Sequence, residues 1–234
     1  LLSSAISAYG EPELESNKIE TQNLDKQQKI NNKNYYLINS LDEIDKWIEE
    51  AEEVGEVAVD TETTSLDPHQ ADLVGISLCS KIGKACYIPV GHKSPKCLKK
   101  DAVIKKLKKI LEDPSIKKIG QNIKFDFIVF YKCGITLSSM EDTMLMSYVL
   151  DAGKNRHNMD TLSEIHLGHK TISFKDMVGT GKKEINFSEV ELDKAKDYAA
   201  EDADITFRLY KKFIKNLKSE KMTNIYEIFE KPLI

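Results

Sequence analysis

The chain has 234 residues, of which 41% are hydrophobic and 31% are charged, and its net charge is −4. These values are typical of a soluble chain that is long enough to bury one good-sized core. The charge argues against a strongly basic protein that coats nucleic acid, but not against an enzyme that grips a short strand in a local groove. The sequence contains no apolar run long enough to span a membrane.

The two ends of the chain carry little pattern. The apolar stretch Leu1–Ala8 lacks a basic start, so it is not predicted to be a signal peptide. Polar composition without periodicity predicts a flexible interdomain linker over residues 1–34, and residues 35–234 are the predicted folded domain. The chain lacks an initiator Met and ends in mid-pattern, so we expect it to be a fragment of a longer protein. No C-x-x-C pair occurs, and reduced thiols are predicted for the four cysteines: Cys79, Cys86, Cys97 and Cys133.

Strands dominate the first half of the predicted fold. They are expected at residues 35–39, 57–63, 72–80, 84–89 and 117–120. Ser40 is predicted to cap an amphipathic helix, and a second helix is predicted at Lys99–Glu112. The lysines of this second helix are better explained by a solvated face than by a DNA-binding patch. Three consecutive strands without a helix between them predict an antiparallel or mixed portion of the sheet.

Helices dominate the second half. They are predicted at residues 122–133, ending at Gly134, at 143–150, capped by Asp142, at 161–167, and from Glu189 to about Leu217. Strands followed by helices predict an α/β fold in which a mixed β-sheet is covered by helices.

Two acids, one residue apart, end the strand-like segment Val57–Thr63. Because side chains alternate between the two faces of a strand, Asp60 and Glu62 are predicted to project together. Paired carboxylates repel each other unless a cation lies between them, and hard divalent metals prefer oxygen ligands. The pair alone is weak evidence for a metal site, because acids often simply cap a strand, so its meaning depends on further acids in the chain.

Two later segments supply such acids. Asn122 and Asp126 stand at i and i+4 of a predicted helix, although they could also be a helix cap and a surface acid. Tyr198 and Asp202 repeat the spacing, and the alanines beside them would let this helix approach another element closely. The other acids of this segment are predicted to point elsewhere and to be solvated: Glu201 and Asp204.

The ordered set D-x-E, N-x-x-F-D and Y-x-x-x-D resembles the three motifs of the DEDD superfamily of 3′–5′ exonucleases. The tyrosine indicates the DEDDy branch, because the histidine branch would need His where Asp197 stands. The closer resemblance is to the proofreading domain of the bacterial, family A DNA polymerase I proteins, from about residue 35 to the C-terminus. It is carried by VDTETTSLD (59–67), GQNIKFD (120–126), DTML (142–145), RHNMD (156–160), KTISF (170–174) and YAAEDAD (198–204).

This resemblance implies an RNase H-like sheet and removal of nucleoside monophosphates from DNA 3′ ends. It also implies two divalent cations, Mg²⁺ or alternatively Mn²⁺ or Zn²⁺. By resemblance, Asp60 bridges both ions, while Glu62 and Asp202 complete the site of the attacking water. Asp126 holds the second ion, in part through water, and Tyr198 positions the attacking water. The implied partners are a single-stranded DNA 3′ end and covalently linked polymerase and 5′ nuclease domains, in a bacterial cytoplasm, as a monomer and without a membrane.

The resemblance also implies substrate contacts. Leu66 and Phe174 resemble residues that wedge against and stack on terminal bases, with ordinary core packing as an equal alternative. The residues that resemble those lining the strand and its phosphates are Gln121, Asn122, Phe125 and Arg156. No ligand spacing is seen among the histidines, which are expected to be structural or exposed: His69, His92, His157, His166 and His169.

Two rival interpretations stay open. An RNase D-like exoribonuclease would share the four acids and the tyrosine, but the fit to polymerase I around Asp67 and Arg156 is closer. We also see no appended RNA-binding helical region after Leu217. The other rival is an inactive scaffold or single-strand-binding module, and the presence of all four acids weighs against it.

Overall fold

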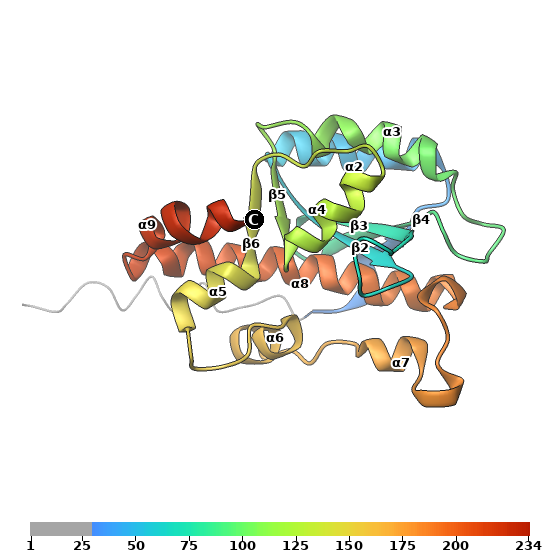
Figure 1. The fold of residues 1–234 in the computed structure, drawn as a ribbon. Coiled ribbons are helices and arrows are strands. Elements are labelled where there is room, and N and C mark those ends of the chain that lie inside the picture. Colours follow the sequence, from blue (N-terminus) through green and yellow to red (C-terminus); the bar gives the residue numbers. More distant parts are fainter. Residues whose placement is uncertain (1–29) are drawn as a thin grey trace, which may run out of the picture.

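The computed structural model describes residues 30–234, apart from the side chain of Lys182. The interpretations of Leu1–Ala8 and of most of the predicted linker therefore lie outside the described residues. Six strands form one mixed sheet in the order β1-β4-β3-β2-β5-β6 (Figure 1). The strands are β1 (Tyr35–Leu37), β2 (Glu56–Thr63), β3 (Leu73–Lys81), β4 (Lys84–Pro89), β5 (Lys117–Gly120) and β6 (Met140–Asp142).

The register of the sheet shows why it is mixed. The consecutive strands β2, β3 and β4 are antiparallel, as expected from the absence of helices between them. The outer pairs β1–β4, β2–β5 and β5–β6 are parallel. β2 lies inside the sheet between β3 and β5. β5 pairs with residues 56–58 at the start of β2, whereas Asp60, Thr61 and Glu62 pair with β3.

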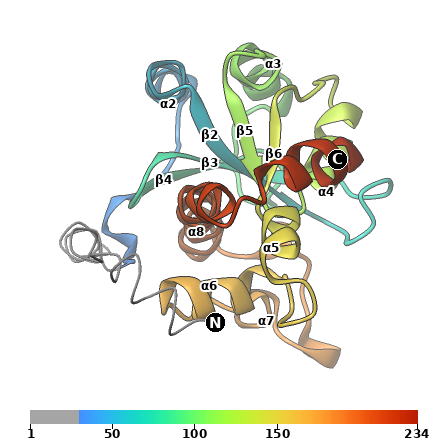
Figure 2. The ribbon, with the colours of Figure 1, turned by 90° about the vertical axis from the view of Figure 1, so that its left-hand side faces the viewer.

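Helices cover both faces of this sheet (Figure 2). They are α2 (Leu41–Val54), α3 (Lys100–Leu111), α4 (Ile123–Lys132), α5 (Thr143–Asp151), α6 (Met159–Leu167), α7 (Phe174–Val178), α8 (Leu192–Ser219) and α9 (Thr223–Ile225). Apolar residues of α2, α3 and α4 form one core with the sheet, and those of α5, α6 and α8 form a second core. Within the described part of the chain, no helix combines the length and apolar composition that a membrane crossing requires.

Local sequence signals account for several helix ends. The Ser40 hydroxyl accepts a hydrogen bond from the Glu43 N–H at the start of α2, and Asp142 caps α5 by accepting from the Met144 N–H. Gly134, in the left-handed conformation with φ 81°, follows α4. The strand β6 and the helix α7 were not predicted, because three and five residues are too short to show a period.

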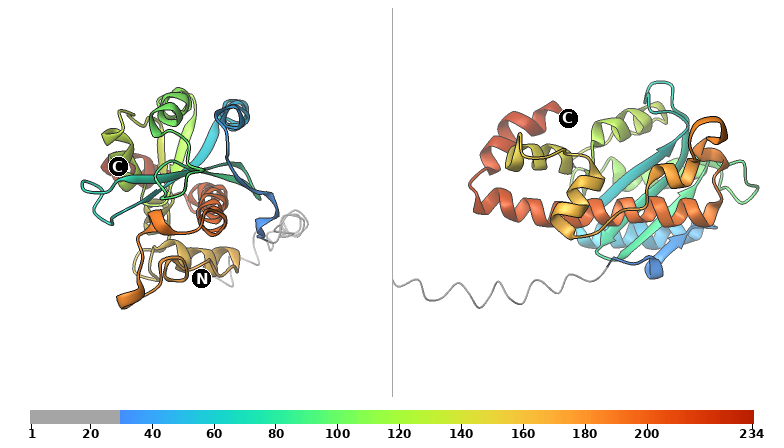
Figure 3. Two further views of the ribbon diagram at one scale, coloured as in Figure 1. Left: turned by 90° about the vertical axis from the view of Figure 1, so that its right-hand side faces the viewer. Right: turned by 90° about the horizontal axis from the view of Figure 1, so that it is seen from below.

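The long helix α8 is buried over most of its circumference. It packs against strands β1 to β5 on one side and against α5 and α6 on the other (Figure 3). Every residue from Ala199 to Tyr210 is buried. Polar side chains in this stretch must therefore find partners inside the protein.

The prediction that Asp204 is solvated was wrong for this reason. Its carboxylate is 0% exposed and accepts hydrogen bonds from the Tyr35 hydroxyl at 2.9 Å, the Gly83 N–H at 2.7 Å and Arg208 Nε at 3.0 Å. These contacts join α8 to β1 and to the turn between β3 and β4. Asp204 is thus a buried, paired acid that ties the helix to the far strands of the sheet.

We predict that Asp204→Ala lowers the free energy of unfolding by about 3–5 kcal/mol, because it breaks a buried ion pair and removes the acceptor of two further donors. Denaturant unfolding measured by circular dichroism tests this. The exposed Asp193 on the same helix is the control, and its alanine variant should cost less than about 1 kcal/mol. Equal losses in the two variants would contradict this role of Asp204.

Candidate functional site

The two acids of the D-x-E segment project from β2 toward α8. Along the strand, Val57 and Val59 pack in the core beneath α2 and α3, whereas Ala58 packs in the core beneath α8. Strand alternation therefore turns Asp60 and Glu62 to the α8 side. The register with β3 shifts between Glu62 and Thr63, so pairing becomes irregular just where the acids lie.

Helix α8 supplies a third acid and a phenol at the same place. Tyr198 stands one turn before Asp202 on the helix, and both side chains line the same cleft as the acids of β2. Carboxylate oxygens of Asp60, Glu62 and Asp202 lie within 4.8 Å of one another. The neighbouring residues Ala199 and Ala200 are 0% exposed, as expected if small side chains let α8 pack closely on its neighbours.

Asp126 reaches the site from α4. Its Oδ1 accepts hydrogen bonds from the Thr61 N–H at 2.9 Å and from the Thr61 hydroxyl at 2.6 Å. Thr61 stands between the two acids of β2, so this contact fixes α4 against the acidic strand. Asp126 lies outside the group of three converging carboxylates. Its charge nevertheless raises the pKa of Glu62, and its own pKa is raised by burial and then by the charge of Asp60.

Electrostatics make the four carboxylates mutually unfavourable when ionised. Removal from water raises the pKa of Asp60 to about 6 and also raises the pKa of the other three acids. The charges of Asp60, Asp202 and Asp126 raise the pKa of Glu62 further. An oxygen-rich, anionic cluster of this kind fits a hard divalent cation, which would relieve the repulsion.

A cleft of about 560 Å³ opens beside the acids. Leu66, Phe125 and Phe174 lie on its walls together with Asp60, Glu62, Tyr198 and Asp202. Leu66 is 90% exposed and Phe174 is 41% exposed, so core packing does not account for either side chain. The Phe174 ring stacks on Phe187 with centroids 6.0 Å apart and an interplanar angle of 6°.

Three of the expected strand-binding residues do not line this cleft. The Gln121 amide donates to the His157 carbonyl at 2.7 Å, and Arg156 is exposed. Asn122 is exposed at the N-cap of α4 with φ 63°, whereas Asp126 is buried. Asn122 is therefore a helix-cap residue, the alternative that the sequence left open, and it shares no helical face with Asp126 because it precedes the helix in a left-handed conformation.

One wall of the cleft was missed by sequence reasoning. It is formed by the segment before α8, consisting of Glu184, Ile185, Asn186 and Phe187. The Asn186 amide donates to the Thr64 carbonyl at 3.0 Å and joins this wall to the end of β2. The only local signal is the Asn186 cap, whose side chain accepts from the Ser188 N–H, and such a cap indicates a turn without indicating its location.

The prediction that Glu201 is solvated was also wrong. Its carboxylate is 6% exposed, lies 2.9 Å from His169 Nε2 and accepts from the Ile172 N–H at 2.7 Å. These contacts anchor the segment that leads into α7 and Phe174. Three other histidines have interior partners: His92 hydrogen-bonds Tyr87, His157 hydrogen-bonds Ser147, and His166 packs edge-on against Phe213.

The family model described as 3′–5′ exonuclease matches residues 35–218 of this chain. The DNA polymerase I of Rhizobium leguminosarum is 43% identical over 222 residues, which are 86% of this chain and 22% of the relative. The chain thus spans 22% of the length of this curated relative.

Two solved structures show how widely the fold is shared. Brucella melitensis NrnC is 25% identical with a TM-score of 0.63, and the match covers 82% of this chain and 85% of that one. Escherichia coli RNase D, an exoribonuclease, is 19% identical with a TM-score of 0.60, covering 80% and 46% of the two chains. The expectation of an RNase H-like mixed sheet covered by helices is confirmed.

The family match covers the acidic strand, α4 and the part of α8 that carries Tyr198 and Asp202. Its residue range begins at the first strand of the sheet. Together with the identity to full-length relatives, it confirms the resemblance expected from the order of the acids. The chain belongs to the 3′–5′ exonuclease family of the bacterial DNA polymerase I proteins.

Proposed function

We propose that this domain hydrolyses the terminal phosphodiester bond of a DNA 3′ end and releases nucleoside monophosphates. The observation that carries the proposal is the convergence of the Asp60, Glu62 and Asp202 carboxylates within 4.8 Å at one end of a partly apolar cleft. A single strand needs both features, a cationic centre for its phosphate and apolar walls for its bases.

The four carboxylates are the groups that would hold divalent cations. Asp60, Glu62 and Asp202 would share one cation, and Asp60 and Asp126 a second. Bound Mg²⁺ would activate a water and neutralise charge on the phosphate. Brucella melitensis NrnC, which shares the fold, has been solved with bound Mg²⁺, which supports this choice over Mn²⁺ or Zn²⁺.

Tyr198 is assigned the role of orienting the attacking water. Burial, followed by the charge of Asp202, raises the pKa of its phenol above the ordinary value, so the hydroxyl stays protonated at neutral pH. A protonated phenol can hold a water by hydrogen bonding but cannot remove its proton. Its place in the cleft, with Asp60, Glu62 and Asp202, puts the phenol beside the acids.

The exposed walls of the cleft are assigned to the terminal nucleotides. Leu66 would wedge against a base and Phe174 would stack on one, a mode that tolerates any sequence. Phe125 lines the same cleft. Gln121, Asn122 and Arg156, which lie outside it, would contact the strand farther from its end.

The setting of the domain is part of the proposal. Because the chain spans 22% of its curated relatives, we infer a longer protein with polymerase and 5′ nuclease domains, acting in the bacterial cytoplasm as a monomer. In that setting the activity would proofread newly made DNA. An RNase D-like exoribonuclease is the second candidate, because RNase D has the same fold.

Asp60→Ala should lower the rate on a single-stranded DNA oligonucleotide by about a thousandfold or more at saturating Mg²⁺, because metal ions supply both the nucleophile and the charge stabilisation. The exposed Glu49 on α2 provides a control, and Glu49→Ala should retain the full rate. Gel analysis of DNA and RNA substrates, with and without EDTA, is the measurement. Normal DNA hydrolysis by Asp60→Ala would end the assignment, and faster RNA hydrolysis by the unchanged protein would favour the second candidate.

The pH dependence of stability gives a test that needs no substrate. A carboxyl pKa raised from 3.8 to about 6 favours the folded state while protonated, so stability is lost as the pH rises through about 6. Without metal, Asp60→Asn should therefore gain about 2 kcal/mol over the parent between pH 4 and pH 8. Added Mg²⁺ should stabilise the parent more than the variant. Denaturant unfolding with Glu49→Gln as control measures both effects, and a pH-independent difference would contradict them.

Phe174→Ala should raise KM for a single strand about tenfold, the value of one stacked base, and change kcat less. Steady-state kinetics at saturating Mg²⁺ make the measurement. The control is Ile228→Ala, since Ile228 is an apolar residue, 61% exposed, outside the cleft. An unchanged KM in Phe174→Ala would remove this residue from the substrate site.

A further inference from the structure

The Asp142-Thr143-Met144-Leu145 motif has no role in the proposed chemistry, yet it contacts the segment that carries Asp126. The Asp142 carboxylate is 2% exposed, and in addition to capping α5 it accepts from the Asn122 N–H at 3.0 Å and the Ile123 N–H at 3.1 Å. One carboxylate thus caps two helices.

The Asp142 carboxylate caps α4 because the N-cap residue of that helix does not. The first N–H groups of a helix have no partner within the helix, and Asn122, at the N-cap, makes no side-chain hydrogen bond to them. Asp142 supplies the missing acceptor from β6. Asp126 lies in the first turn of α4, so Asp142 holds the end of the helix from which Asp126 projects.

Thr143 and Gly120 also contribute to the packing between the end of β5, the start of α4 and the start of α5. The Thr143 hydroxyl donates to the Gly120 carbonyl at 3.1 Å. A Cβ added to Gly120 would lie 2.7 Å from the Cβ of Ile123, so β5 and the start of α4 approach each other too closely for any larger residue. The two motifs, residues 120–126 and 142–145, therefore pack directly against each other.

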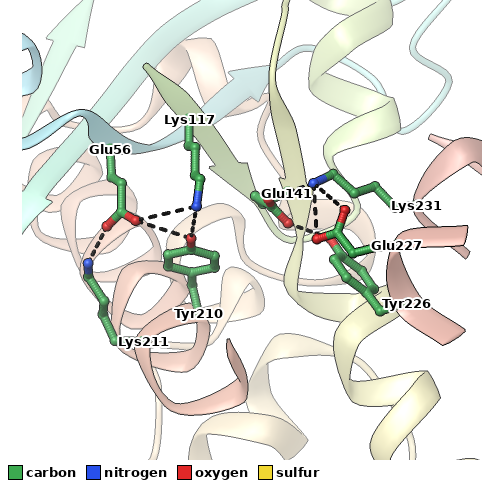
Figure 4. Close-up of polar contacts among 8 residues, drawn as sticks. All are labelled: Glu56, Lys117, Glu141, Tyr210, Lys211, Tyr226, Glu227 and Lys231. Atoms are coloured by element: carbon green, nitrogen blue, oxygen red, sulfur yellow. Dashed lines mark hydrogen bonds and ion pairs between the residues drawn. The ribbon is translucent and has the colours of Figure 1, made fainter. Parts of the chain in front are cut away.

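The buried phenol of Tyr226 contacts the backbone of Asp142. Tyr226 is 0% exposed, and its hydroxyl accepts from the Asp142 N–H at 3.1 Å and donates to Glu141 Oε2 at 2.9 Å. Lys231 donates to Glu141 at 2.8 Å and to Glu227 at 3.0 Å (Figure 4). We call Glu141, Tyr226, Glu227 and Lys231 the Tyr226 cluster.

A second cluster beside it has similar chemistry but different anchors (Figure 4). The Tyr210 hydroxyl donates to Glu56 at 3.2 Å and accepts from Lys117 at 3.3 Å, and Lys211 also pairs with Glu56. Glu56 and Lys117 begin β2 and β5, so these contacts go neither to β6 nor to α4. This Tyr210 cluster provides a matched control, since Tyr210 is 1% exposed.

We propose that Asp142 is a positioning residue for the metal site, and that Tyr226 holds Asp142 in place. The proposal rests on the function proposed above. Asp142 fixes the start of α4, while Thr61 holds the Asp126 carboxylate from the acidic strand. These two restraints fix the position from which Asp126 faces the acids of β2, where it could share a cation with Asp60.

Binding of Mn²⁺ to the protein without DNA, followed by electron paramagnetic resonance, tests the proposal on four single variants. Asp142→Asn should weaken the Mn²⁺ site that Asp126→Asn abolishes, by about tenfold. Tyr226→Phe should weaken it by about fivefold, the value of one hydrogen bond. Tyr210→Phe should bind like the parent. All are measured at a temperature where circular dichroism shows the folded state, so that stability does not enter the comparison.

The contrast between the two phenols decides the outcome. Equal Mn²⁺ binding by Tyr226→Phe and Tyr210→Phe, at either the parental or a weakened level, would overturn the proposal even if Asp142→Asn failed to fold. The double variant Asp126→Asn/Asp142→Asn gives a second test. If it binds the remaining Mn²⁺ more weakly than Asp126→Asn alone, Asp142 does not act through Asp126 and the proposal is overturned. Should the parent bind Mn²⁺ as expected but hydrolyse no DNA, the proposed function fails while the positioning role stands.

Discussion

Mutual repulsion among buried carboxylates is the constraint on which the rest of the structure depends. Asp60 and Glu62 come from one strand, Asp202 from α8, and Asp126 from α4, and burial raises the pKa of each. No local preference would gather them, because each ionised neighbour makes the next less favourable. The sheet, the shared helix cap and the Thr61 contact together hold them there, and the folding energy of the remaining domain must offset the cost.

Helix α8 performs three tasks with neighbouring residues. Tyr198 and Asp202 face the acidic strand, Glu201 anchors the segment leading to α7, and Asp204 ties the helix to β1 and the turn after β3. A helix enclosed on several sides can do this because each successive side chain meets a different neighbour. Acids that would be solvated on a surface helix become structural ones here.

The sequence was sufficient to predict five of the six described strands, the shared direction of Asp60 and Glu62, and the family, because strand alternation and the ordered acids are local patterns. It was insufficient wherever an outcome depended on what packs against a residue. Glu201 and Asp204 were expected in solvent, since helical spacing does not show how many sides of a helix are covered. The wall from Glu184 to Phe187 was missed because an irregular segment carries no period. For Asn122 the spacing left a helical face and a helix cap open, and only the structure shows that it is the cap.

The Tyr226 hydroxyl also occupies a backbone group at the edge of the sheet. β6 is an edge strand, and an edge strand presents unpaired backbone groups that a strand of another chain could join. Here the Asp142 N–H is already bonded to a buried phenol, and the strand is three residues long. In the folded domain this contact and the shortness of the strand leave few backbone groups on this edge for a strand of another chain to join.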